Sequence, residues 1–324
     1  MPRPLKVKAD ARKLVTTRSQ LALLLNVHPC FIERVVAGPA EFYGEMTVPK
    51  ANGEPRTINP PKKPLRRAQR ALLRVLYQRF RIPGYLHGGI PRRSIVTHAS
   101  LHVGYRMVAT LDVKGFFPST TRLHVEPIFA AAGFVGEALE DAIALTLLNG
   151  SLPQGSPASC FLANFAFIPA DQQFLLLCKR KSFNYSRYVD DIAISGDYDI
   201  SELKGPFVNV IREGGYEVAP KKIIFRSSGE RQVVTGLVVN EKLRPTSEFI
   251  AELKHSIRLC MELGPETVAI CEGVEMGELK LRLTGRVGHV AQCDPRLGRR
   301  LHGLMCGVDW ARAAATSRTR PLRP

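Results

Sequence analysis

The sequence holds an acidic pair placed where it could bind metal ions. Asp190 and Asp191 are adjacent, and apolar residues with a strand-like alternation flank them across residues 185–196. We therefore predict two short strands with both carboxylates at the turn between them. Adjacent carboxylates repel one another, so both stay ionised only beside a compensating cation. Mg²⁺ suits such oxygen-rich sites and takes phosphate as a further ligand.

A third acidic residue lies upstream in a similar setting. Asp112 follows the apolar run 108–111 and precedes a Gly-Phe-Phe-Pro break, as at the end of a buried strand. An acid in that position is costly unless a partner or a metal compensates its charge. If this strand lies beside the 185–196 hairpin, three carboxylates converge and can hold two divalent ions. Two ions about 4 Å apart activate a hydroxyl and stabilise a leaving pyrophosphate in nucleotidyl transfer.

Three segments then resemble successive motifs of the reverse transcriptase family, in the family's order. They are residues 111–117, the Leu-Pro-Gln-Gly-Ser-Pro loop 152–157, and Tyr-Val-Asp-Asp at 188–191. The resemblance implies an α+β, right-hand polymerase fold of fingers, a palm with an antiparallel sheet, and a helical thumb. It implies an RNA-directed DNA polymerase in which a primer hydroxyl attacks the α-phosphate of a deoxynucleotide.

The same resemblance assigns the metal site. Asp112, Asp190 and Asp191 would be the catalytic acids, and together with Val113 they would hold two Mg²⁺ ions, with Mn²⁺ as an alternative.

Basic and polar residues match the family's nucleotide-binding positions. Residues 46–58 predict two strands joined around an Asn-Gly turn, with Lys50 and Arg56 projecting from the hairpin. By resemblance they contact the triphosphate of the dNTP, and Gln154 reaches the nucleotide or the template base. From the residues alone, this could equally be a solvated basic hairpin.

Two further nucleotide contacts follow from the resemblance. Phe117 lies where the family places a ring beneath the 2′ position, which implies a DNA product, although a core Phe is the alternative. The family also keeps a lysine near the leaving phosphates, and both Lys221 and Lys222 fit that position.

Two elements resemble the retron subfamily of reverse transcriptases. Residues 98–102, His-Ala-Ser-Leu-His, are similar to its Asn-Ala-x-x-His element with His in place of Asn, and Val-Thr-Gly stands intact at 234–236. Val189 departs from the Ala that retron enzymes usually carry. The resemblance implies a primer grip at Thr235, Gly236 and Leu237.

Retron resemblance also implies partners. The template and primer would be a cognate structured non-coding RNA, and synthesis would start from an internal guanosine 2′-hydroxyl. The product would be a branched, 2′–5′-linked RNA–DNA molecule, within an anti-phage system that can include an effector protein.

Several basic residues are candidate RNA contacts. The alternative for each is that its side chain is simply exposed to solvent or serves packing. His98 and His102 have i,i+4 spacing but no third metal ligand close in sequence, which disfavours a metal site there. Residues 285–290 with Asp294-Pro295 resemble the thumb segment of retron-type enzymes. The RNA-binding candidates are Arg92, Arg93, His98, His102, Arg286, Arg299 and Arg300.

Composition supports a polyanionic partner. The chain has 324 residues, and 46 Lys and Arg against 29 Asp and Glu give a net charge of +17. With no lipid signal, nucleic acid is the leading candidate. Seven scattered cysteines without a Cys-x-x-Cys pair, and no apolar run of membrane-spanning length, predict a cytoplasmic protein with no membrane partner.

The predicted helices and strands must bring together residues that are spread over most of the sequence. We expect a helical extension at 1–40, fingers at 41–104, a palm at 105–244 with fingers elements within 122–160, a thumb at 245–315 and a disordered basic tail at 316–324. The helices predicted from apolar periodicity are 11–25, 29–37, 64–80, 122–132, 137–148, 159–181, 200–214, 248–263, 276–291 and 296–313.

Two other functions compete with this one. Another bacterial reverse transcriptase, of the diversity-generating or abortive-infection type, would share the chemistry and differ in its RNA and its priming. A polymerase-like protein that only binds RNA is the alternative from another class. The complete acidic triad disfavours it, because a binding protein has no need for three carboxylates that repel one another.

Overall fold

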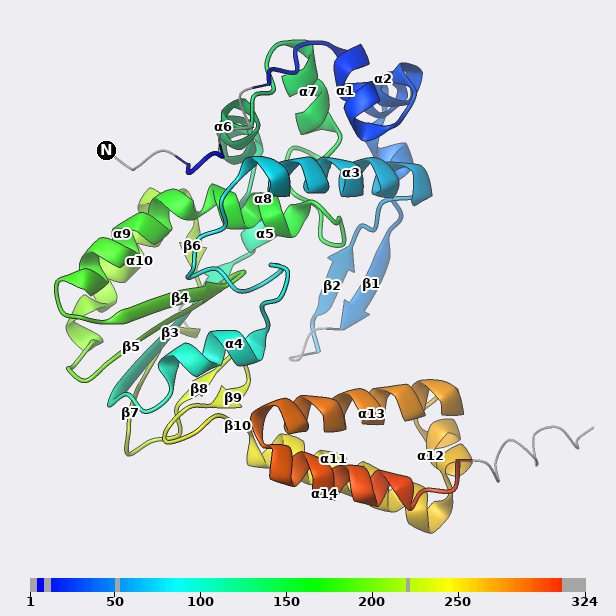
Figure 1. Cartoon of the computed structure of the whole chain (residues 1–324), viewed down its shortest axis with the longest axis vertical. Helices are drawn as coiled ribbons and strands as arrows, with labels where there is room; N and C mark the ends of the chain where they lie inside the picture. Colours follow the sequence, from blue (N-terminus) through cyan, green and yellow to red (C-terminus); the bar gives the residue numbers. More distant parts are fainter. Residues whose placement is uncertain (1–4, 9–12, 50–52, 220–221, 311–324) are drawn as a thin grey trace, which may run out of the picture. The chain divides into compact units, whose positions relative to one another are not determined.

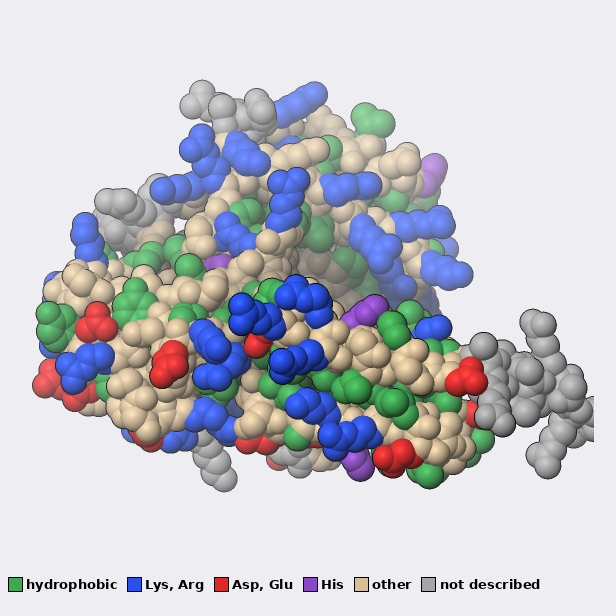
Figure 2. All heavy atoms as spheres, turned by 60° about the horizontal axis from the view of Figure 1, so that its bottom comes forward, with side chains coloured by type: hydrophobic (Ala, Val, Ile, Leu, Met, Phe, Trp, Pro, Cys, Tyr) green, Lys and Arg blue, Asp and Glu red, His purple; other side chains and the backbone are tan. Residues whose placement is uncertain are grey.

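The computed structural model describes residues 5–8, 13–49, 53–219 and 222–310, and the chain forms two compact units. The first unit comprises Met1–Ser94 and Tyr105–Ser227, and the second Ile95–Gly104 and Ser228–Pro324. Figure 1 shows helices together with antiparallel sheets, so the predicted α+β class is confirmed. In Figure 2 Lys and Arg side chains are spread over much of the displayed face, as the charge of +17 requires.

The first unit is built around a five-stranded sheet. Its central strand β3 (Met107–Lys114) pairs with β5 (Asp191–Gly196), which in turn pairs with β4 (Asn184–Tyr188). The other edge of β3 pairs with β6 (Glu217–Val218) and β7 (Ile224–Ser227). Every pairing is antiparallel, as predicted for this part of the chain. The acidic residues at 112 and 191 therefore sit on adjacent strands.

Three helices pack beside this sheet (Figure 1): α8 (Ser159–Ala166), α9 (Ile168–Lys179) and α10 (Lys204–Glu213). The single helix predicted over 159–181 is wrong, because the chain bends by 48° between α8 and α9. Pro169 lies in the first turn of α9, where it lacks an N–H and would crowd the preceding turn of a continuous helix.

Each remaining helix of the first unit overlaps a predicted range, except the short helix α5 (Phe116–Ser119), which the sequence did not predict. The others are α1 (Arg18–Leu25), α2 (Pro29–Ala37), α3 (Lys63–Arg79), α6 (Arg122–Ala131) and α7 (Glu137–Ala144). The helix predicted from residue 11 begins only at Arg18, because the Thr17 side chain accepts a hydrogen bond from the Gln20 N–H and caps it there. The helix predicted to reach residue 148 ends at Ala144.

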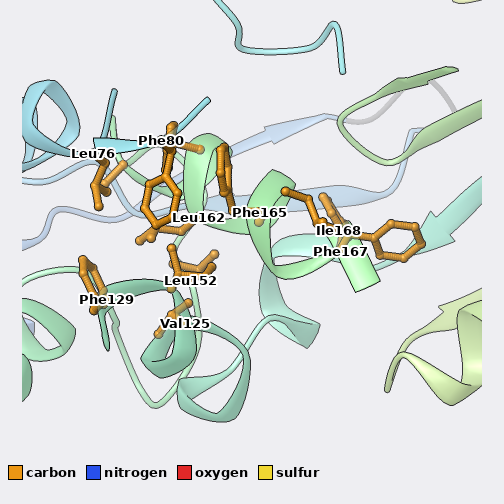
Figure 3. Close-up of a cluster of buried hydrophobic side chains, with 14 of the residues drawn as sticks. Leu76, Phe80, Val125, Phe129, Leu152, Leu162, Phe165, Phe167 and Ile168 are labelled. Atoms are coloured by element: carbon orange, nitrogen blue, oxygen red, sulfur yellow. The ribbon is translucent and has the colours of Figure 1, made fainter. Parts of the chain in front are cut away.

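Apolar side chains from α3, α6 and α8 join these helices into one core. Figure 3 shows Leu76, Phe129, Leu162 and Phe165 pointing toward one another. The rings of Phe161 and Phe165 stack with centroids 4.2 Å apart. The same buried cluster continues into the strands of the sheet, so helices and sheet form one packed support for the acidic residues.

The second unit contains α4 (Ile95–Ala99), the 3-10 turn η3 (Ser100–His102) and a small sheet of β8 (Val233–Val234), β9 (Leu237–Val238) and β10 (Arg244–Pro245). A helical bundle follows, made of α11 (Ser247–Leu263), α12 (Pro265–Cys271), α13 (Met276–Cys293) and α14 (Pro295–Cys306). This bundle has its own apolar core. The sequence did not predict α12, and α14 ends at Cys306 although a helix was predicted to 313, of which 311–313 lie outside the described residues.

No single helix in the described ranges is long and apolar enough to cross a membrane, although the bent pair of α8 and α9 is so by length and composition.

Candidate active site

The three acidic residues meet at one end of the sheet. In the pairing of β3 with β5, Asp112 lies directly opposite Asp191. Asp190 occupies the turn between β4 and β5, and its carbonyl accepts a hydrogen bond from the Val113 N–H at 3.1 Å. Two segments almost 80 residues apart are thus tied together at the residues predicted to converge.

The electrostatics of this end of the sheet favour a bound cation. Burial raises the pKa of Asp190, and repulsion from Asp112 raises it further. Burial, then repulsion from Asp190 and Asp112, raises the pKa of Asp191 to about 7. Both shifts mean that the ionised carboxylates lack sufficient positive charge around them. The donor set therefore fits divalent cations.

Lys222 supplies part of the missing charge. Its Nζ donates to Asp112 Oδ2 at 2.6 Å, and this hydrogen bond raises the pKa of Lys222. As the side chains stand, the described part of the chain contains no group of three or more His, Cys, Asp or Glu arranged to hold a metal ion. Metal binding by the triad and Val113 remains a prediction. Lys221, the alternative to Lys222, lies outside the described residues.

The turn that carries the acidic pair is strained. Val189 has φ +59°, a left-handed conformation that a β-branched residue rarely adopts. Such a conformation costs on the order of 1–3 kcal/mol and persists only where the surroundings enforce it. Gly88 packs against this turn so closely that a Cβ there would lie 2.7 Å from the Val189 nitrogen. We expect any side chain at Gly88 to displace the turn.

A fully buried arginine supports the same turn from inside the protein. Arg187 Nη1 donates to the Val189 carbonyl at 2.7 Å, and the guanidinium also donates to both carboxylate oxygens of Asp171 and to Asn164. Its Cζ lies 4.8 Å from the centroid of the Phe167 ring. Although burial opposes the charge, the Asp171 carboxylate keeps the pKa of Arg187 above its ordinary value.

Neither Arg187 nor Asp171 was among the residues predicted from the sequence. Arg187 is the one charged residue of β4, and a charged side chain is almost never fully buried without a partner, so Arg187 could have been singled out. Its partner Asp171 could not have been, because nothing in the sequence pairs a strand residue with that turn of α9.

The nucleotide-binding candidates of the fingers hairpin and the Gln154 loop are in mutual contact. Strands β1 (Met46–Pro49) and β2 (Pro55–Ile58) form the predicted hairpin. Arg56 Nε donates to Gln154 Oε1 at 2.6 Å, and the Asn59 N–H donates to the Gln154 carbonyl at 2.8 Å. The two segments therefore form one surface. Lys50 lies outside the described residues.

Phe117 is half-buried at the start of α5, directly after the β3 strand end. Its neighbour Phe116 is the ring that enters the core, at 2% exposure. Phe117 packs beside it with ring centroids 6.0 Å apart. The partial exposure of Phe117 is compatible with a ring that meets a ligand.

The two retron-like elements meet in the second unit. Thr235 and Gly236 form the β8–β9 turn with φ of +45° and +80°, and Leu237 begins β9. Thr235 Oγ1 lies 3.3 Å from His98 Nδ1, and the His98 and His102 rings are 5.7 Å apart. Both imidazoles are fully buried, which disfavours the prediction that His98 and His102 touch RNA directly.

Of the arginines predicted to bind RNA, some form contacts within the protein and others are exposed to solvent. Arg93 donates to the carbonyls of Pro83, Gly84 and Leu86, so its guanidinium closes its own loop. Arg286 forms an ion pair with Glu252 at 3.1 Å and lies over the Phe249 ring. The candidates that remain exposed are Arg92, Arg299 and Arg300. RNA contact by any of these arginines stays a prediction.

Comparison with known proteins finds several retron reverse transcriptases that are similar to this chain. No protein-family model matches the chain. The retron Mx162 reverse transcriptase of Myxococcus xanthus is 29% identical over 308 residues, covering 85% of this chain and 63% of that protein. The retron Mx65 reverse transcriptase of Myxococcus xanthus is 31% identical over 281 residues, covering 80% and 63%. The retron Ec86 reverse transcriptase of Escherichia coli is 26% identical over 214 residues, covering 64% and 67%.

This chain thus spans less than two thirds of the length of either Myxococcus relative. Among solved structures, a foamy viral protease-reverse transcriptase in complex with double-stranded DNA aligns with 78% of this chain and 39% of its own. The identity is 19% and the TM-score 0.37.

Proposed function

Because this chain is a homologue of the retron reverse transcriptases, we propose that it is an RNA-directed DNA polymerase of the right-hand type. The observation that carries the proposal is the placement of Asp112 opposite Asp191, with Asp190 at the adjoining turn. In the wider proposal, the substrate is a cognate structured non-coding RNA. The product is a short, branched RNA–DNA molecule with a 2′–5′ linkage, made within an anti-phage retron system.

Each residue near the acidic site has a role in the proposed chemistry. Asp112, Asp190 and Asp191, with Val113, would hold two Mg²⁺ or Mn²⁺ ions, which supply activation of the primer hydroxyl and neutralisation of phosphate charge. Arg56 presents a planar guanidinium suited to a triphosphate, and Gln154 fixes its direction through their shared hydrogen bond. Positioning and charge stabilisation account for most of phosphoryl-transfer catalysis.

Magnesium is expected to stabilise the folded protein. An ion that binds only the folded arrangement adds about 2.7 kcal/mol of stability at a concentration 100 times its Kd. Titration of Mg²⁺ into metal-free protein should therefore raise the unfolding temperature, and Asp112→Asn should remove most of that rise. Glu217→Gln, a change at an exposed carboxylate on β6, is the matched control. An equal rise in all three proteins would exclude the triad as the binding site.

Phe117 is expected to select deoxynucleotides. A side chain that crowds a ribose 2′-hydroxyl costs about 1–3 kcal/mol, or roughly 5- to 150-fold in rate. Phe117→Ala should lower the preference for dGTP over GTP in kcat/KM by such a factor, whereas Phe117→Tyr should keep it. Unchanged selectivity in the Ala variant would instead assign Phe117 to packing, and thermal unfolding of both variants checks that they fold.

The nucleic acid that accompanies the protein tests the wider proposal. We would purify the protein from its native host and sequence the bound nucleic acid before and after RNase treatment. A short, discrete DNA joined to RNA through a 2′–5′ linkage supports the retron product. Unbranched or heterogeneous DNA leaves the polymerase and removes the branched product. RNA without DNA, from wild type and from Asp190→Asn/Asp191→Asn alike, favours the RNA-binding alternative.

A further inference from the structure

A cavity of about 660 Å³ lies between α13 and α14 in the second unit. Its size falls within the roughly 300–1,000 Å³ typical of small-ligand sites. Trp310, which follows α14, lines it together with Lys280, Gly288, Ala291, Gly298 and Arg299. We call this the α13–α14 pocket.

Small residues determine the shape of the α13–α14 pocket. At Gly298 the helices touch, because a Cβ there would lie 2.4 Å from the Ala291 Cβ. At Gly288, three residues before Ala291 on α13, an added Cβ would meet nothing within 4 Å. The two helices are thus in close contact at Gly298 and leave a hollow at Gly288. The glycines of α13 and α14 therefore account for the cavity.

The charge around the α13–α14 pocket is of one sign. Lys280 and Arg299 line it, and no acidic residue does. Neither takes part in an ion pair within the described residues, whereas Arg282 and Arg286 of α13 are paired with Glu272 and Glu252. Lys280 Nζ lies 5.5 Å from the centroid of the Trp310 ring.

These features suit an unpaired nucleotide. Proteins bind single-stranded nucleic acid by stacking bases on aromatic rings while basic side chains follow the phosphates. An apolar hollow with one aromatic ring and two unpaired cations at its border offers both contacts. A basic or neutral peptide would leave the cations without partners.

We propose that the α13–α14 pocket binds one unpaired base of the RNA partner against Trp310, with Lys280 and Arg299 on the flanking phosphates. The proposal rests on the proposed function only in taking RNA as the partner. It adds a subsite that reads an unstacked base, which would let the bundle distinguish a loop or bulge from continuous duplex.

The test uses the fluorescence of Trp310, the single Trp in the chain. Short single-stranded RNA titrated into the full chain should quench this fluorescence, and a fully paired RNA duplex of equal length should quench it much less. Gly288 lines the pocket, and a Cβ added there meets nothing within 4 Å. Gly288→Met should therefore occupy the hollow and weaken single-strand binding about tenfold, the value of one stacked base. Gly285→Met is the matched control, because it lies on the same helix, has open space and does not line the pocket.

The charged residues give a second comparison. Arg299→Gln should weaken binding and make it less dependent on salt, because one phosphate contact is lost. Arg296→Gln, an exposed arginine of the same helix outside the pocket lining, should do so less.

The outcomes distinguish a failure of the pocket proposal from a failure of the proposed polymerase function. Equal binding by Gly288→Met and Gly285→Met, or equal quenching by duplex and single strand, would overturn the proposal. So would quenching by poly-glutamate as tight as that by RNA, which would assign the pocket to an acidic protein. DNA synthesis by the wild-type protein on a generic primed RNA is measured in parallel. If synthesis fails while quenching follows the pattern above, the proposed function falls and the pocket stands.

Discussion

Replacing both Asp190 and Asp191 by Asn is expected to lower DNA synthesis at least about a thousandfold while leaving the protein folded. Metal ions contribute several kcal/mol to stabilising the charge of the transition state, and each 1.4 kcal/mol or so is a factor of ten in rate. Asn keeps the shape of Asp but cannot replace its charge at the metal. Primer extension on RNA by variant and wild type measures the loss.

Stability provides an internal check on this variant. The pKa of Asp191 in the folded protein is about 7, above its ordinary 3.8, so its ionisation costs folding free energy as the pH rises through this range. Asn carries no such cost. In metal-free buffer the variant should therefore unfold at the same or a higher temperature than wild type at pH 8, and the difference should vanish toward pH 4.

RNA binding distinguishes catalysis from other causes of lost activity. The variant should bind RNA as well as wild type, since the carboxylates repel phosphate. Full DNA synthesis by the double Asn variant would remove these residues from the chemistry and, with them, the proposed function.

Arg187→Met is expected to destabilise the fold by about 3–5 kcal/mol, the usual cost of breaking one side of a buried ion pair. Both Arg187 and Asp171 are fully buried, so the change leaves a carboxylate without its cation. It also removes the donor to the Val189 carbonyl. Urea unfolding followed by circular dichroism measures the loss.

A double variant separates the charge from the packing. Arg187→Met with Asp171→Leu removes both charges, and buried pairs replaced by apolar residues are often neutral in stability. We expect the double variant to recover part of the loss. As a control, Glu217→Gln breaks an exposed ion pair with Lys114 and should change stability much less than Arg187→Met does.

Activity of the double variant then tests whether Arg187 positions the acidic turn. The double variant lacks the hydrogen bond from Arg187 to the Val189 carbonyl. The strained φ of Val189, +59°, should therefore relax. The folded double variant should therefore lose kcat while its KM for dNTP changes little. Unaltered kcat in a stable double variant would reduce Arg187 to a structural role.

Local sequence was sufficient wherever neighbouring residues decide the structure. The alternation around residues 185–196 predicted two strands with the acidic pair at their turn, and β4 and β5 confirm it. Residues 46–58 predicted the hairpin of β1 and β2. The periodicity of residues 29–37 matched α2 at both ends. The helix predicted over 159–181 is wrong at Pro169, where the chain bends between α8 and α9, because apolar periodicity alone does not reveal such a break.

The order of motifs was also sufficient to predict which proteins are related to this chain. The segments containing Asp112, Gln154 and the 190–191 pair resemble reverse transcriptase motifs, and homology to retron reverse transcriptases over most of the chain confirms that resemblance. No tertiary information entered this step, because the residue types and their order are themselves the signal.

Only the tertiary structure decided which residues meet and which are buried. The strand register places Asp112 opposite Asp191, and the packing of α9 on the sheet pairs Arg187 with Asp171. His98 and His102, which were predicted from the sequence to contact RNA, are buried. A sequence shows that a residue is charged or apolar, but the free energy of a charge depends on its surroundings in space. Those surroundings come from segments far apart along the chain, and therefore only the folded protein determines them.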